Sequence, residues 1–252
     1  MELRAEVYTR KQLAKALDNR NLSIIYAPYS IVDKSLSAEN SRIVLVPPVY
    51  LADCEQRIAK RFAELKNEGF YKVLVHTIGH IQLFSEMGFE LYGGVRLNCM
   101  NSDSLAFYSD YGVKDIILSS ELTAYQIDQL EKNIRTGIIA YGYLPLMITR
   151  RCPIKNGKPC NKECCGRTVK DRMNNELHVI CSENTAEILN SDVLYIADKM
   201  KHFSSTDFAV LKFTVEAETD DIINSYLNNK KPPMDKFTRG LYFRGVKNQV
   251  KI

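Results

Sequence analysis

The chain has 252 residues, of which 45% are hydrophobic and 25% charged, a composition typical of a globular protein that buries a sizeable core. No apolar run approaches the ~20 residues that a bilayer-spanning helix requires, and the charged start, residues 1–6, lacks the apolar stretch of a secretory signal. The sequence therefore predicts a cytoplasmic protein without a membrane partner. In that reducing compartment, the seven cysteines are not expected to form a disulfide framework.

The net charge of +4 is the sum of an acidic body and two basic segments. From Arg150 to Arg172, eight Lys or Arg residues stand against two acidic ones, and from Lys230 to Ile252 seven stand against one. Each basic segment therefore carries +6, which leaves −8 for the rest of the chain. Basic segments on an acidic body predict contact with the phosphate backbone of RNA, while the body avoids non-specific contacts.

Short β-branched runs alternate with amphipathic stretches in the first part of the chain, as in repeated βα units. Strands are predicted at residues 3–8, 23–27, 43–46, 72–76, 90–97, 115–119 and 137–143, and helices at 53–67, 102–111 and 123–133. Runs that are apolar at successive positions, such as 43–46, favour parallel strands covered on both faces.

This regular pattern ends at Ile148. Residues 150–181 are predicted to form a long Cys-rich loop, because most of this stretch is polar and lacks a usable period. Further strands are predicted at 177–181, 193–197 and 209–215, a helix at 220–229, and a basic aromatic tail at 230–252. The number of βα units favours an α/β fold, a TIM-like (βα) barrel formed by a single domain, 1–229, with one or two strands outside it. A doubly wound open sheet is the alternative.

Five of the seven cysteines fall within one 30-residue window: Cys152, Cys160, Cys164, Cys165 and Cys181. Four thiolates brought together here could hold Zn²⁺ tetrahedrally or ligate an iron–sulfur cluster. The neighbouring Lys and Arg side chains favour the thiolate form. The expected ligands are Cys152, Cys160, Cys164 and Cys181, with Cys165 as the substitute for Cys164. The spacing predicts ligation but does not decide which metal is bound.

Other polar residues are weaker signals. His76 ends a strand and could point into a barrel mouth, but a hydrogen-bonded structural histidine is the expected role. Glu121 and Asp171 lie at or beyond strand ends, where barrel enzymes keep their chemistry, and they are candidate catalytic residues together with Arg172. Their alternative role is to cap a helix or to pin a loop. The sequence contains no common hydrolase motif.

Arginines and aromatic residues are interleaved in the basic segments. Such a pattern is typical of stacking on exposed bases, with a solvated loop and tail as the alternative. The candidate RNA-binding residues are Arg150, Arg151, Arg239, Tyr242, Phe243 and Arg244.

Several segments together resemble a known family. They are residues 97–102 (LNCMNS), 119–123 (SSELT), 142–153 (GYLPLMITRRCP), the cysteines that follow, 171–173 (DRM) and 237–246 (FTRGLYFRGV). In combination they resemble the collagenase-like peptidase family of unknown catalytic type, family U thirty-two. The resemblance extends from Leu3 to Val246.

The resemblance implies a TIM-like barrel with a [4Fe–4S] cluster on cysteines. Despite the peptidase name, better understood relatives take part in oxygen-independent hydroxylation of ribosomal RNA, transfer RNA or quinone precursors. The family's cluster ligands carry over to Cys152 and to Cys160 or Cys164/Cys165, and less directly to Cys181. Where many members have His-Gly-Ala-Leu-Cys, this chain has YGYLP at 141–145.

The chain resembles the C-terminal half of the long family members, since their alanine- and glycine-rich first βα unit is missing. A separately encoded N-terminal-half protein is therefore an expected partner. Three functions follow as hypotheses: an iron–sulfur or metal protein that acts in RNA hydroxylation, a peptidase as the family name implies, or a non-catalytic interaction module with a structural Zn site.

Overall fold

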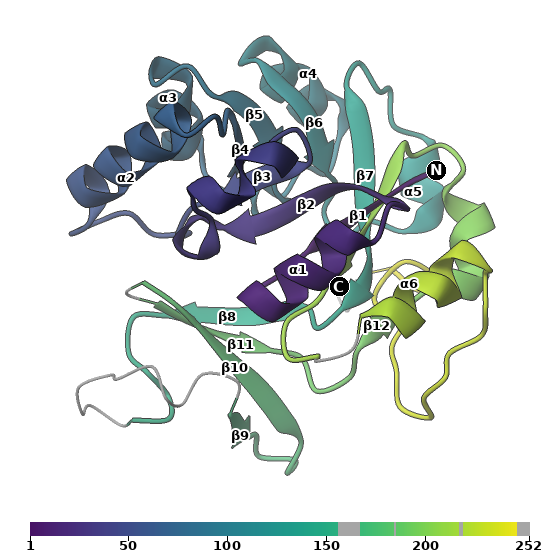
Figure 1. Ribbon diagram of the computed structural model, residues 1–252. Helices are drawn as coiled ribbons and strands as arrows, with labels where there is room; N and C mark the ends of the chain where they lie inside the picture. Colours follow the sequence, from purple (N-terminus) through teal and green to yellow (C-terminus); the bar gives the residue numbers. More distant parts are fainter. Residues whose placement is uncertain (156–166, 184, 217–218, 246–252) are drawn as a thin grey trace, which may run out of the picture.

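In a computed structural model that describes residues 1–155, 167–183, 185–216 and 219–245, eight parallel strands close into a barrel (Figure 1). The strand order is β7-β13-β1-β2-β3-β4-β5-β6, and β6 pairs with β7 to close the ring. The barrel strands are β1 (Glu2–Glu6), β2 (Leu22–Pro28), β3 (Ile43–Val46), β4 (Lys72–Val75), β5 (Glu90–Gly93), β6 (Val113–Ile117), β7 (Arg135–Gly142) and β13 (Phe208–Lys212). The predicted TIM-like barrel is confirmed, and this closure rules out the open sheet.

Helices follow most of the barrel strands. They are α1 (Arg10–Asp18), α2 (Glu55–Asn67), α3 (Ile78–Glu86), α4 (Ser102–Asp110), α5 (Ala124–Asp128) and α6 (Asp220–Leu227), with 3₁₀ helices η1 (Tyr29–Ile31), η2 (Lys34–Glu39), η3 (Val95–Leu97) and η4 (Ala197–Phe203). In α2 the buried stripe is Ile58, Phe62 and Leu65, as its sequence period predicts. Within the described ranges, no helix is both long and apolar enough to cross a membrane.

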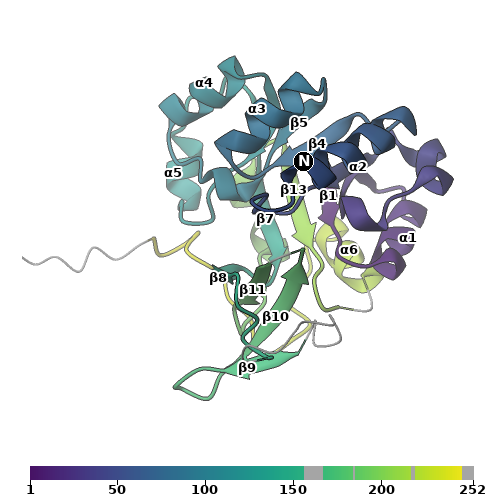
Figure 2. The same cartoon turned by 90° about the vertical axis from the view of Figure 1, so that its left-hand side faces the viewer.

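A second, antiparallel sheet lies beyond the carboxyl ends of the barrel strands, and we call it the small sheet (Figures 1 and 2). Its strands are β8 (Pro145–Thr149), β11 (Thr185–Leu189), β10 (Glu176–Ser182) and β9 (Thr168–Lys170), in the spatial order β8-β11-β10-β9. The strand predicted at 177–181 is part of β10, whereas β9 lies where only loop was expected. Strand β9 has only three residues, too few to show a sequence period. Residues 156–166 of the expected loop lie outside the described ranges.

The described part of the expected tail packs on the barrel from Phe237 onward. Thr238 forms a parallel bridge to Leu194 of β12 (Leu194–Tyr195), which itself pairs antiparallel with the end of β7. Tyr242 is 1% exposed, and its hydroxyl donates to the carbonyl of Ile139 at 2.8 Å. Residues 237–242 thus pack against the barrel, although their composition allows a solvated segment.

Polar side chains occupy the interior of the barrel below the carboxyl ends of its strands. Arg4 is fully buried and donates to Asp115 at 2.8 Å and to the Tyr26 hydroxyl at 2.7 Å. Its guanidinium also lies 3.6 Å from the centre of the Phe208 ring. Burial raises the pKa of Asp115, and the adjacent Arg4 opposes this rise. Strands β1, β2 and β6 are therefore linked by one buried cation.

Candidate active site at the barrel mouth

A cavity of about 140 Å³ lies between the carboxyl ends of the barrel strands and the small sheet. We call it the mouth cavity. Its barrel side is formed by residues that follow or end β1, β2, β3, β4, β5 and β13, and its outer side by the β10–β11 hairpin. The polar and thiol residues used below are Glu6, Tyr8, Tyr29, His76, Arg96, Cys181, Glu183, Glu187 and Lys212. In barrels of this type the chemistry is found at this end.

Glu6 and Lys212 form a buried ion pair in this cavity. They are register partners at the ends of the adjacent strands β1 and β13, and Lys212 Nζ lies 2.9 Å from Glu6 Oε1. The Tyr8 hydroxyl donates to the same oxygen at 3.1 Å. Burial by itself would lower the pKa of Lys212, but Glu6, Tyr8 and Glu187 raise it above its ordinary value. Lys212 is therefore a fixed cation and not a neutral amine nucleophile.

A second ion pair connects the barrel to the small sheet. Arg96 of η3 lies 2.5 Å from Glu187 Oε1 of β11. The side chain of Glu187 is 9% exposed, and its second oxygen, Oε2, is buried without a hydrogen-bond partner among the described residues. A buried carboxylate oxygen that accepts no hydrogen bond is costly.

His76 lies after β4 at the edge of the same cavity and is 7% exposed. Its Nδ1 is buried without a hydrogen-bond partner in the described structure and faces Gly94, where a Cβ atom would lie only 2.6 Å away. Burial lowers the pKa of His76 well below its usual range, and His80, Arg96 and Lys212 act in the same direction. The imidazole is therefore neutral at pH 7. The hydrogen-bonded structural role expected for this histidine is not seen at Nδ1.

The β10–β11 hairpin is held over the mouth by Glu183 as well. The hydroxyl of Tyr29 donates to Glu183 Oε1, and Arg57 Nη2 donates to Oε2 at 2.7 Å. Tyr29 follows β2 and Arg57 lies on α2, so the hairpin is connected to two neighbouring βα units. Since Cys181 lines the cavity from the same hairpin, the docked hairpin also positions a candidate metal ligand.

Two of the five candidate metal ligands, Cys152 and Cys181, lie in the described ranges, and Cys160, Cys164 and Cys165 lie outside them. Thr149 of β8 and Cys181 of β10 both pair with Ala186 of β11. This register brings the chain that leads to Cys152 and the strand that carries Cys181 to one end of the small sheet. Two thiols at the same end fit a thiolate metal centre. Within the described ranges, three or more His, Cys, Asp or Glu residues are not gathered in a metal-binding group.

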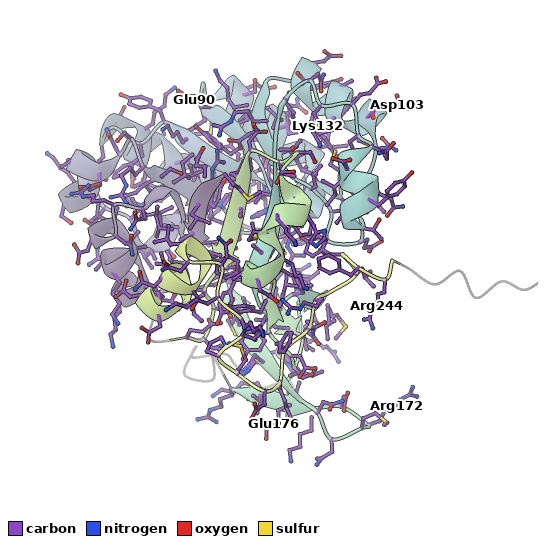
Figure 3. The ribbon with its side chains drawn as sticks, turned by 90° about the vertical axis from the view of Figure 1, so that its right-hand side faces the viewer. Glu90, Asp103, Lys132, Arg172, Glu176 and Arg244 are labelled. Atoms are coloured by element: carbon purple, nitrogen blue, oxygen red, sulfur yellow. The ribbon has the colours of Figure 1, made fainter. Side chains whose placement is uncertain are left out.

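The structure does not bring the three candidate catalytic residues together. Asp171 accepts hydrogen bonds from the backbone of Met173 and Asn175 and from the Asn175 side chain, which lower its pKa and pin the β9–β10 turn. Arg172 lies on the same turn, at the end of the small sheet that points away from the barrel (Figure 3). Glu121 is exposed after β6. None of the three lines the mouth cavity, and Asp171 has the loop-pinning role given above as its alternative.

The candidate RNA-binding residues separate into buried and exposed groups. Arg239 makes a bidentate ion pair with Asp198 at 2.5 and 2.9 Å. Tyr242 is buried, so in this structure its ring is not accessible for stacking on a base. Phe243 is 43% exposed and packs against His202 and Phe203.

The remaining three candidates in the basic segments are accessible. Arg244 points outward from the packed tail (Figure 3). Arg150 is 2.5 Å from Asp53 and lies over the ring of Tyr50, but more than half of its side chain is exposed. Arg151 is exposed beside it. Three arginines therefore remain available for a polyanion.

Sequence reasoning missed most of the mouth residues. Lys212 is a charged residue at the end of an otherwise apolar strand, and a charge in such a position is a signal that could have been used. Glu6 gives a weaker signal, because its strand also contains Glu2 and Arg4. Arg96 and Glu187 carry no comparable signal, because they meet only when the small sheet docks on the barrel.

A closed ring of eight parallel strands with polar residues at its carboxyl end defines a TIM-like barrel protein. Residues 29–220 match the family model described as peptidase family U32. The chain therefore belongs to peptidase family U32.

One relative matches part of the chain. A protein from Methanocaldococcus jannaschii, described as an uncharacterized protease, is 33% identical over 87 residues, which are 32% of this chain and 21% of that protein. The chain thus matches about a fifth of the length of this relative. No solved structure matches the chain.

Proposed function

We propose that this chain is a metal-containing enzyme that modifies RNA, with its reaction at the mouth cavity and its metal centre on the Cys-rich segment. The observation that carries the proposal is that Cys181 lines the same cavity as Lys212, His76 and Glu187. A purely structural Zn site has no need to adjoin a polar cavity. Since a candidate ligand lies in the cavity wall, the structure favours a metal that takes part in the reaction over one that only stabilises a loop.

The proposed metal centre is a [4Fe–4S] cluster, with Zn²⁺ as the alternative. The proposed ligands are Cys152, Cys181, Cys160 and Cys164 or Cys165. When bound, a cluster supplies electron transfer. The chain itself contributes two buried ion pairs and a neutral imidazole to the wall of the mouth cavity, where the proposed substrate binds. The reaction class that the family resemblance implies is hydroxylation without molecular oxygen.

RNA as the substrate is supported by the exposed cations near the mouth and on the small sheet. They are Arg57, Arg150, Arg151, Arg167, Lys170 and Arg172. Exposed cations near the mouth and along the small sheet suit a substrate with a phosphate backbone. A separately encoded protein that resembles the N-terminal half of the long family members is the proposed partner.

Peptidase activity is the second candidate function. The family description and the name of the relative from M. jannaschii favour it. Against it, the carboxylates Glu6 and Glu187 at the described mouth are each bound to a cation, which competes with a substrate proton for the carboxylate. If casein is degraded by the purified protein, and Lys212→Met abolishes this degradation, the peptidase hypothesis replaces the one above.

The metal centre is tested by anaerobic purification followed by iron, sulfide and zinc analysis. We expect iron and sulfide in equal amounts and an absorbance shoulder near ~400 nm. Cys152→Ser and Cys181→Ser should each lower the iron content by more than half, whereas Cys99→Ser, in a buried barrel position, should retain it. Colourless protein that contains zinc would support the structural module, and iron retained in both ligand variants would contradict the proposed ligands.

The RNA substrate is tested by the salt dependence of binding. Affinity for a structured RNA should fall steeply between 50 and 200 mM salt, as expected from about three or more phosphate contacts. Replacing Arg150 and Arg151 by Gln should reduce the slope of log affinity against log salt by about 2. Arg20→Gln, an exposed arginine between α1 and β2, is the control. An unchanged slope in the double variant would remove this surface from the proposal.

A further inference from the structure

We propose that the small sheet, which lies outside the ring of barrel strands (Figures 1 and 2), is a hinged lid on the mouth cavity. It turns on its two connections to the barrel and is held closed by polar contacts at the β10–β11 hairpin. The inference goes beyond the proposed function, because it holds for any substrate that reaches this cavity. The apolar packing of the small sheet, its connections and its contacts with the barrel support it.

The small sheet has an apolar cluster of its own. Val179, Ala186 and Ile188 form the centre of this cluster. Among the described residues, the strands of the small sheet contribute none to the cluster that fills the barrel. Burial of apolar surface is the main favourable contribution when elements pack. The small sheet can therefore change its position relative to the barrel without opening either cluster.

Both connections lie at one end of the small sheet. Residues 143–144 lead from β7 into β8, and residues 190–193 lead from β11 to β12. Because β8 and β11 pair antiparallel, the start of β8 lies beside the end of β11. The backbone N–H of Asn190 donates to the carbonyl of Leu144 at 2.9 Å, which ties the two connections together. Two adjacent connections at one end of a sheet can act as a hinge.

The contacts that hold the hairpin on the barrel are polar. Tyr29 and Arg57 both donate to Glu183, in the turn at the opposite end of β11 from the hinge. The side chain of Arg57 is 60% exposed, and an exposed ion pair typically changes an equilibrium by about fivefold or less. Arg96 and Glu187 form a buried pair, in which the lost hydration of both charges offsets much of their attraction. These contacts therefore favour the closed position only modestly.

The closed lid leaves little room at the mouth. The cavity has a volume of about 140 Å³, and the β10–β11 hairpin forms its outer side, whereas sites for drug-sized ligands have roughly 300–1,000 Å³. A substrate of ordinary size therefore enters only when the hairpin moves. Every proposed metal ligand lies in the chain between the start of β8 and the end of β11, so the proposed metal centre does not tie the lid to the barrel.

Movement of the lid is tested by pulsed electron paramagnetic resonance on the anaerobically purified full chain. Spin labels are attached to azide-bearing residues introduced at Met173, 74% exposed on the β9–β10 turn, and at the exposed Lys60 of α2, so that the native cysteines stay unmodified. We expect a shorter and a longer distance between the labels. The share of the longer distance should rise from about 0.1 M to about 1 M salt, because the Debye length falls from about 10 Å to about 3 Å and the Arg57 pair is screened.

The latch is tested by removing its donors on the barrel side. Arg57→Ala combined with Tyr29→Phe should raise the ratio of open to closed lid at least fivefold at the lower salt concentration. Arg20→Ala, which removes the exposed ion pair with Glu39 of η2, is the matched control and should leave this ratio unchanged. Equal effects of the double variant and the control would overturn the inference.

Access to the cavity is tested by the rate at which diethyl pyrocarbonate modifies His76, which lines the cavity and is 7% exposed. The exposed His202 and the buried His80 are internal references in the same samples. The ratio of His76 to His202 modification should rise with the share of the longer distance, while His80 stays protected. A distance distribution that salt leaves unchanged, or a His76 rate that does not follow it, would contradict the lid. If the double variant does not fold, the salt series of the wild type decides in the same way.

Discussion

At the scale of single residues, burial decides which polar groups keep their ordinary chemistry. His80 lies on α3 and is 2% exposed, and its Nδ1 accepts from the backbone N–H of His76 at 3.3 Å. Burial lowers the pKa of His80 to about 4. The unfolded chain therefore binds more protons than the folded chain between pH 6.5 and pH 4, so the free energy of unfolding falls as the pH falls through this window.

This difference predicts a pH-dependent stability. Lowering the pH from 7 to 5 should reduce the free energy of unfolding through His80 by on the order of 2 kcal/mol, measured by urea denaturation. In His80→Gln, which can still accept from the backbone, the pH dependence in this window should be smaller by that amount. The same pH dependence in wild type and variant would show that His80 titrates normally.

Gly94 is required because of its neighbour and not because of its own backbone angles. Its φ of −82° is open to any residue, but an added Cβ would lie 2.6 Å from Nδ1 and 3.0 Å from Cε1 of His76. Gly94→Ala should therefore displace the imidazole and reduce stability by about 1–3 kcal/mol. The His76 NMR signal and thermal denaturation measure the two effects.

Gly79→Ala in α3 is the control, since its added Cβ would meet no atom closer than 3.9 Å. It should leave the His76 signal in place and be neutral or slightly stabilising. An unmoved His76 signal in Gly94→Ala would contradict the contact.

At the scale of elements, local sequence signals explain where helices begin better than they explain where the segments between the helices pack. Thr9 and Gln12 form a capping box at the start of α1, and Thr123 and Gln126 form another at α5. The packed tail has no such local signal. Its position depends on two long-range contacts, the hydrogen bond from the buried Tyr242 to Ile139 of β7 and the ion pair between Arg239 and Asp198. In each contact the two partners lie more than 40 residues apart in the chain.

Arg239→Ala should therefore release the tail. Loss of the bidentate pair and of the bond from Arg239 to the Tyr195 carbonyl should reduce stability by about 1–3 kcal/mol and speed proteolysis after residue 230. Arg244→Ala removes the same charge from an exposed position and should change stability by less than about 0.5 kcal/mol. Equal effects of the two variants would mean that charge, and not the Asp198 contact, holds the tail.

At the scale of the whole molecule, the barrel is closed around buried charges. Arg4 on β1 lies between Glu2, Tyr26 of β2 and Asp115 of β6, so it joins strands from different parts of the ring. A buried carboxylate that loses its cation is left without compensation for its lost hydration.

Arg4→Met should consequently reduce the free energy of unfolding by about 3–5 kcal/mol, measured by urea denaturation. Arg4→Met combined with Asp115→Asn removes both charges and should recover a substantial part of that loss. If the double variant is as unstable as the sum of the two single variants, the ion pair does not account for the effect.

The order and type of the barrel strands could be predicted from the sequence by itself, because each is a local apolar run that needs no distant partner to be recognised. All eight barrel strands overlap predicted ones, whereas α1 and α3 and the short strands β8, β9 and β11 were not predicted. The Cys-rich segment was also visible in the sequence, since cysteine spacing and charge are local properties. Only the tertiary structure decided that the ring closes between β6 and β7, that Tyr242 of the tail is buried, and that Glu187 meets Arg96 at the mouth. These contacts join residues far apart in the chain, and their free energy comes from burial and charge pairing that exist only after the small sheet has docked on the barrel.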